Sequence, residues 1–94
     1  MALEAFTKDP NAILDYGCDW TAWLAGDTIT ASSWAITPTG GTLTTSLPTF
    51  APTGTTTVWL TGGAVGERYT VTNHITTTAG RQNDRSFTLD IVEQ

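Results

Sequence analysis

Over residues 69–76 the chain reads Tyr69-Thr70-Val71-Thr72-Asn73-His74-Ile75-Thr76, which places Tyr69, Val71 and Ile75 on alternate positions. Alternation with a period of two is typical of a β-strand that has one buried and one solvated face. Threonine, whose branched Cβ favours strands over helices, supplies 21 of the 94 residues. The sequence therefore predicts an all-β fold.

Similar patterns predict further strands on both sides of this stretch. They are expected over residues 13–20, 27–36, 55–60 and 87–92. Between Ala31 and Trp34 the apolar positions change phase, as at a β-bulge. Prolines in residues 37–54 allow only short edge strands, for example around Leu43. Residues 20–26 are expected to form a single turn, and residues 77–84 a long hairpin loop. The strand spacing is typical of a β-sandwich.

The segment Gly66–Val71 has the form of a tyrosine corner, in which Tyr69 opens a strand and its hydroxyl bonds to upstream backbone. Val71 stands where an immunoglobulin domain has its second disulfide cysteine, and Cys18 is the only cysteine, so no intrachain disulfide can form. The prediction is an immunoglobulin-like β-sandwich of about seven strands without a disulfide.

This sandwich is expected to form one domain over residues 1–94, with a loose polar arm over residues 1–9. Trp34 is favoured as the core tryptophan, with Trp20 and Trp59 as alternatives. Eight residues are expected to face inward: Tyr16, Trp34, Val58, Leu60, Val71, Phe87, Leu89 and Ile91.

The charge balance excludes several classes of partner. Four basic and nine acidic residues give a net charge of −5, and the basic residues form no cluster. Nucleic acid and anionic membrane surfaces are therefore not expected as partners. No run of 18 apolar residues suggests a transmembrane helix, and residues 1–10 lack the features of a signal peptide. The basic residues Arg81 and Arg85 come late in the chain, whereas four acids come early: Asp9, Asp15, Asp19 and Asp27. This split could pair copies head to tail or close within one molecule.

Catalytic and metal-binding patterns are weak. The only histidine, His74, is interpreted as a sheet residue, and Cys18 as a small apolar residue of the first strand. Asp15, Asp19 and Asp27 do not have the spacing of a calcium loop. We expect no enzyme activity, no cofactor and no metal site.

The chain contains four tryptophans, which is a large number for its length and points to a specific role for some of them. Trp23 and Trp59 are the candidates for exposed protein-contact residues, because interfaces favour tryptophan. Leu3 and Phe6 could anchor the arm in a partner, and Arg81 and Arg85 complete the set of contact candidates. A sugar-stacking surface on the tryptophans is the alternative.

The whole chain also resembles small virion structural proteins of tailed bacteriophages, the fibre-tail adaptor-like group. The motifs that carry the resemblance are Lys8-Asp9-Pro10, Leu14-Asp15-Tyr16, Asp19-Trp20, Trp23-Leu24, Gly26-Asp27-Thr28-Ile29, Val58-Trp59-Leu60-Thr61-Gly62-Gly63, Tyr69-Thr70-Val71-Thr72-Asn73, Gly80-Arg81 and Asp84-Arg85-Ser86-Phe87. The resemblance implies a non-enzymatic adaptor, made in the bacterial cytoplasm, that docks onto tail, fibre, neck or capsid subunits in the virion and could associate with further copies of itself. A capsid-surface decoration protein and a host-surface carbohydrate-binding module are the alternatives.

Overall fold

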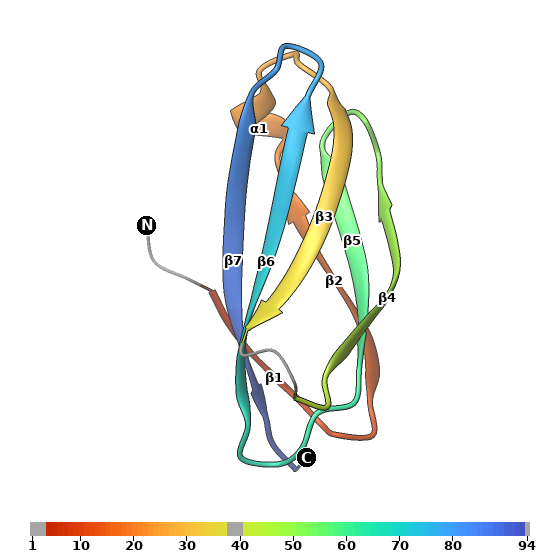
Figure 1. The fold of residues 1–94 in the computed structure, drawn as a ribbon, viewed down its shortest axis with the longest axis vertical. Coiled ribbons are helices and arrows are strands. Elements are labelled where there is room, and N and C mark those ends of the chain that lie inside the picture. The colour runs from red at the N-terminus through yellow and green to blue at the C-terminus, as the bar shows by residue number, and fades with distance from the viewer. Residues whose placement is uncertain (1–3, 38–40, 94) are drawn as a thin grey trace.

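The computed structural model describes residues 4–37 and 41–93 of the chain. They form the strands β1 (Glu4–Lys8), β2 (Ile13–Asp19), β3 (Ile29–Thr37), β4 (Thr44–Phe50), β5 (Thr55–Thr61), β6 (Arg68–Thr77) and β7 (Gln82–Ile91), with one helical turn, α1 (Thr21–Leu24), after β2. The strands make two facing sheets, ordered β1-β7-β6-β3 and β2-β5-β4 (Figure 1). The predicted all-β, immunoglobulin-like sandwich is confirmed, and Cys18 forms no disulfide.

Two groups of apolar side chains fill the space between the sheets. The larger group contains six of the eight residues expected to face inward, while Tyr16 and Trp34 are half-buried and pack against it. The smaller group contains Trp20, which is 0% exposed. Trp20 therefore has the fully buried position for which the sequence favoured Trp34. Trp34 lies in β3, an edge strand, so no neighbouring strand covers it on one side.

Two strands contain an irregularity in their pairing. The register of β3 on β6 shifts between Ile29 and Ala31, close to the predicted bulge. The register of β4 on β5 shifts between Ser46 and Thr49, around Pro48. Proline has no N–H for the ladder, and an edge strand with a bulge tolerates it. This is why β4 is longer than the short strand expected near Leu43.

Two expectations at the ends of the strands are wrong. The loose arm is a strand over residues 4–8, because β1 pairs in parallel with β7 from Glu4↔Phe87 to Lys8↔Ile91. The long loop over residues 77–84 is a tight turn, since β6 continues to Thr77 and β7 already begins at Gln82. Its backbone closes through the N–H of Thr77, which donates to the carbonyl of Arg81 at 2.9 Å.

Tyr69 lies at the second position of β6 and is 2% exposed, as a tyrosine corner requires of its ring. Its hydroxyl, however, donates to Oε1 of Glu67 at 2.5 Å and accepts from the backbone N–H of Thr42 at 3.2 Å. The upstream backbone group predicted to bind this hydroxyl is therefore the N–H of Thr42, in the segment that leads into β4. Tyr69 joins the two sheets at this end of the sandwich.

Candidate functional site

One end of the sandwich is formed by α1 and the turn between β6 and β7, which lie side by side in Figure 1. Arg81, in that turn, donates to the Asp27 carboxylate from Nε and Nη2, each at 3.2 Å. It also donates to the carbonyls of Trp23 and Leu24, at 3.4 and 2.8 Å. Carbonyls in the last turn of a helix lack partners within the helix, so Arg81 satisfies two of them.

Tryptophan and arginine side chains stack at the same end. The guanidinium of Arg81 lies 4.4 Å from the centre of the Trp23 ring, and that of Arg85 lies 4.3 Å from the Trp20 ring. The two indoles meet edge to face, with centroids 5.6 Å apart. Arg85 belongs to β7 and not to the loop, and it donates to the Asp19 carbonyl at 2.5 Å. Three contact candidates, Trp23, Arg81 and Arg85, thus hold α1 against the hairpin.

One of the early acids, Asp27, meets a late base within the same molecule. Arg81 pairs with Asp27, and hydrogen bonding, first of all from the Thr77 side chain, lowers the pKa of Asp27. Arg68 pairs with Asp90 at 2.6 Å on the outer face of the four-stranded sheet. The Arg68–Asp90 pair lies at the surface and contributes no more than about 1 kcal/mol, whereas the Asp27 side chain of the other pair is only 12% exposed.

Phe6 lies in β1 and is 37% exposed. Its ring contacts the rings of Tyr16 and Phe87, with centroid distances of 5.4 and 5.3 Å. Next to it, Lys8 is 0% exposed and donates to the carbonyls of Gly62 and Asp9 at 2.7 and 2.9 Å. Burial lowers the pKa of Lys8, and the neighbouring Asp9 opposes this. Phe6 is therefore a packed residue of the sandwich flank, and Leu3 lies outside the described residues.

Trp59 is the candidate with the clearest outward placement. Its half-buried side chain leaves β5 on the face opposite to the buried Val58 and Leu60. Its cross-strand neighbours are Asp15 of β2 and Ser46 of β4. A half-buried indole thus stands on the outer surface of β5, the middle strand of the β2-β5-β4 sheet.

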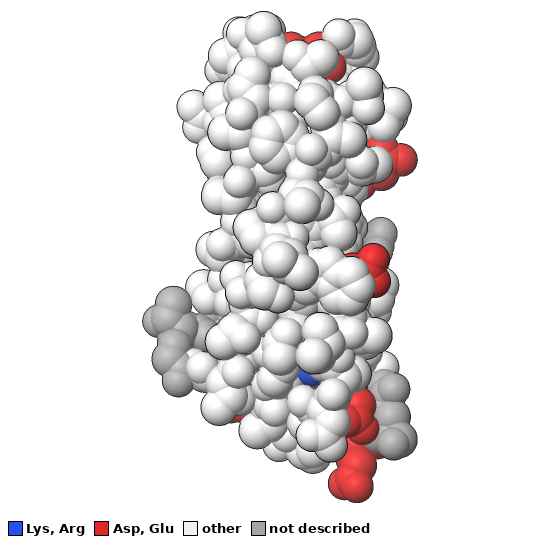
Figure 2. All heavy atoms as spheres, turned by 90° about the vertical axis from the view of Figure 1, so that its right-hand side faces the viewer, with Lys and Arg blue, Asp and Glu red and all other residues white. Residues whose placement is uncertain are grey.

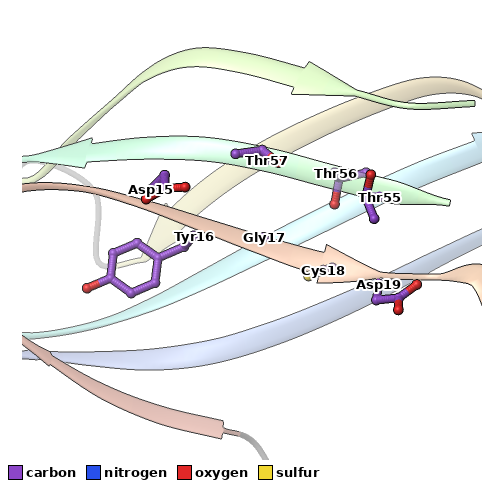
Figure 3. A pocket seen from close by; sticks show the side chains of 8 residues that line it. All are labelled: Asp15, Tyr16, Gly17, Cys18, Asp19, Thr55, Thr56 and Thr57. Atoms are coloured by element: carbon purple, nitrogen blue, oxygen red, sulfur yellow. The ribbon is translucent and has the colours of Figure 1, made fainter.

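A hollow of about 300 Å³ lies on the same sheet, where β2 and β5 pair. Figure 3 shows Asp15 and Asp19 at its two ends, with Gly17 between them. A Cβ at Gly17 would lie 2.5 Å from the carbonyl oxygen of Thr56, so the close approach of the strands requires glycine. Asp19 already accepts from the hydroxyl and N–H of Thr21 at 2.6 and 3.0 Å, and chiefly the hydroxyl lowers its pKa. Positions four apart on a strand are about 13 Å from each other, so the two acids cannot share one ion.

The candidate catalytic side chains lie apart. Cys18 packs against the inner group around Trp20, whereas His74 faces outward on β6 and pairs with Asp84. Within residues 4–37 and 41–93, no three His, Cys, Asp or Glu side chains gather in a group that could hold a metal ion. No helix over the same residues is long and apolar enough to cross a membrane.

Sequence reasoning missed Asn73 as a structural residue. Asn73 is 0% exposed; its Oδ1 accepts from Nε1 of Trp20 at 2.9 Å and from the Thr56 hydroxyl at 2.6 Å. Its Nδ2 donates to Oγ of Ser32 and to the carbonyl of Ser33, both at 2.9 Å. The signal was present, because Asn73 stands at an inward position between Val71 and Ile75.

Comparison with known proteins places the chain in a family. Residues 8–90 match the family model described as podophage GP4 fiber-tail adaptor protein gp77. This range runs from the end of β1 almost to the end of β7. A search among curated proteins found no match. The chain belongs to the family of podophage fibre-tail adaptor proteins, and it is a bacteriophage structural protein of the adaptor type, as its sequence motifs predicted.

Proposed function

We propose that this protein is a non-enzymatic component of the virion, which joins a fibre to the tail by docking onto subunits of both. The family match over residues 8–90 carries the proposal. The sandwich supports it, since α1 and both sheets are fixed by internal bonds and leave rigid outer faces for contact. Rigid partners lose little entropy on binding.

The outer face around Trp59 is our candidate for one of the two docking surfaces. Trp59 stands among small or polar neighbours that pair with it across the sheet, Asp15 and Ser46. A large aromatic residue surrounded by smaller polar ones is the pattern of an interface hot spot. Trp23, by contrast, is held beneath Arg81, and we assign it no direct contact.

The test is incorporation into particles. Mass spectrometry and cryo-electron microscopy of purified virions should find the protein between fibre and tail, and its absence from mature particles would contradict the proposal. In phage that carry Trp59→Ala, we expect fewer copies per particle, whereas Thr57→Ala, on the same strand and face, should leave the copy number unchanged. Equal loss with both variants would remove the role assigned to Trp59.

Carbohydrate binding on the host surface is the second candidate. The observation that favours it is the single indole on a face rich in threonine hydroxyls and flanked by Asp15. A glycan array would detect such binding, and Trp59→Ala should abolish any signal that comes from stacking on this ring. A blank array with the folded protein would exclude this candidate.

A further inference from the structure

Residues 28–66 contain no Asp, Glu, Lys or Arg, although these types make up 14% of the chain. The uncharged stretch includes the whole of β3, β4 and β5. Viewed from the β4 side, the molecule presents a broad surface with few charged side chains; acidic atoms lie mainly along one margin, and a small basic patch is visible low on the face (Figure 2). The centres of protein interfaces are depleted in charged residues in the same way.

Four strands form the edges of the two sheets, namely β1, β3, β2 and β4. Proteins protect such edges from pairing with other chains by short length, charged side chains, proline or bulges. Here β1 has only five residues and directs Lys8 inward, β2 exposes Asp15 and Asp19, and β4 contains Pro48 beside a bulge. Three of the four edges are therefore protected.

The exception is β3, which runs for nine residues without a charge or a proline. Its bulge lies at the start and leaves Ala31–Thr37 in regular register with β6. On the outer face this part of β3 carries only small exposed side chains: Ala31, Ser33, Ala35 and Thr37. In the described part of the chain, β3 pairs with β6 alone, and Ile29 donates one backbone bond to Pro52 at 3.0 Å. Over residues 4–37 and 41–93, no strand pairs with the other edge of β3, which is the edge on which a further strand would add.

We propose that two copies of this chain pair through β3, edge to edge and antiparallel, so that their four-stranded sheets become one continuous sheet. Identical edges that meet antiparallel satisfy a twofold axis, the commonest symmetry of protein dimers. This inference goes beyond the adaptor role and does not depend on it.

The distribution of charge favours a second copy as the occupant. Two molecules that each carry a net charge of −5 repel one another, and charged groups pressed together in an interface would add to this. The side chains that residues 28–66 contribute to such a contact are all uncharged. The uncharged surface formed by residues 28–66 is thus the one on which two copies meet with the least electrostatic repulsion.

The size of the surface is sufficient. A standard interface buries about 800 Å² on each partner, roughly one-seventh of the accessible surface of 5385 Å². Nine residues of β3 extend for about 30 Å, in a molecule whose longest dimension is 41 Å. The neighbouring β4 adds Leu47 and Phe50, which are 69% and 38% exposed. β3 therefore offers backbone groups for pairing, and the neighbouring β4 offers apolar surface area.

Sedimentation velocity over a concentration series tests the proposal, with Ala35→Lys and Ala5→Lys as a matched pair. Both alanines are exposed on edge strands of the same sheet, Ala35 on β3 and Ala5 on β1. We expect the unmodified protein to dimerise, Ala35→Lys to weaken the dimer at least about tenfold, and Ala5→Lys to leave it unchanged. Ser33→Lys serves as a second variant of the β3 edge if Ala35→Lys does not fold.

Hydrogen exchange locates the contact without any substitution. The backbone amides of residues 31–37 that point away from β6 should become protected as the dimer forms. A protein that stays monomeric at about 1 mM, where even a dimer with a Kd of about 1 mM is substantially populated, would overturn the proposal. A dimer whose protection lies elsewhere, or which Ala5→Lys weakens equally, would overturn it too. None of these results bears on incorporation into virions, so the two proposals fail separately.

Discussion

Asn73 is a single residue whose hydrogen bonds connect several elements of the fold. Its side-chain amide lies in β6 and bonds to groups of β3, β5 and the residue that follows β2, so it joins the two sheets. All four hydrogen-bonding positions of the amide are occupied, which is what permits a polar group to be buried here. An apolar residue of similar size would pack but would leave several partners unpaired.

Replacement of Asn73 by alanine is predicted to lower the free energy of unfolding by about 3 kcal/mol or more. The indole N–H of Trp20 and the hydroxyl of Thr56 would lose a buried partner, and each buried polar group without a partner costs about 1–3 kcal/mol. Urea denaturation measures the difference. The exposed Asn11→Ala should change the stability by less than about 0.5 kcal/mol, and equal effects of the two variants would refute the assigned role.

Tyr69→Phe tests the hydrogen bonds of a second buried residue. The ring stays packed, but the hydroxyl that joins Glu67 and the backbone of Thr42 is lost. We expect the unfolding free energy to fall by about 0.5–1.5 kcal/mol, the usual net value of a hydrogen bond. Tyr16→Phe is the control, because among the described residues the Tyr16 hydroxyl has no hydrogen-bond partner. A comparable loss in the control would mean that the hydroxyl of Tyr69 has no special role.

At the level of elements, β1 shows where sequence patterns fail. Residues 4–8 have a single large apolar side chain, Phe6, and a short polar strand of this kind resembles an arm in isolation. Its pairing with β7 and the burial of Lys8 against the Gly62 carbonyl depend on residues more than 50 positions away. Deletion of residues 1–7, which removes most of β1, is therefore expected to destabilise the fold, whereas loss of a loose arm would not.

Phe6 and Phe50 are almost equally exposed but differ in their ring contacts. A comparison of their alanine variants therefore distinguishes the effect of packing on stability from the effect of exposure. Phe6 in β1 is 37% exposed and touches two aromatic rings, while Phe50 in β4 is 38% exposed and touches no ring among the described residues. Phe6→Ala should lower the thermal midpoint more than Phe50→Ala, with a loss of about 1–2 kcal/mol for Phe6, since more than a third of the residue is already exposed. A larger effect for Phe50 would show that β1 contributes little to the fold.

The strands that could be predicted are those whose side chains alternate clearly. Residues 13–20, 55–60, 69–76 and 87–92 show that pattern, and β2, β5, β6 and β7 cover these ranges except for Trp20 and Val92. Of the contact candidates, only Trp59 could be placed correctly from the alternation around Val58 and Leu60. The internal roles of Trp23, Arg81 and Arg85 could not be predicted, because they arise where α1 meets a hairpin that is distant in the sequence.

In the whole molecule, stability should depend on pH in the acid range. Hydrogen bonds lower the pKa of four carboxyl groups below their ordinary values of 3.8 for aspartate and 4.5 for glutamate: Asp19, Asp27, Glu67 and Asp90. A group with a lowered pKa in the folded state stabilises above its ordinary value, and this contribution disappears as the pH falls through the folded value. The bonds around these groups are therefore expected to weaken together in acid.

We predict that the urea midpoint declines progressively below about pH 4.5, the ordinary pKa of glutamate. In Glu67→Gln the decline should be shallower. A glutamine side chain takes up no proton in this pH range, so its hydrogen bond with the Tyr69 hydroxyl does not depend on pH. Denaturation curves at several pH values measure both effects. A midpoint that stays constant or rises down to about pH 3 would contradict the prediction.

The parallel pairing of β1 with β7 has a mechanical consequence. The first strand and the last run side by side in the same direction, with five residues of β1 in register with Phe87–Ile91. A force that draws the chain before β1 and the chain after β7 apart acts along both strands in opposite directions. The backbone bonds between them then bear the load in shear, all at once, and do not open one after another like a zipper. The molecule is thus built to resist tension that is applied through its two ends.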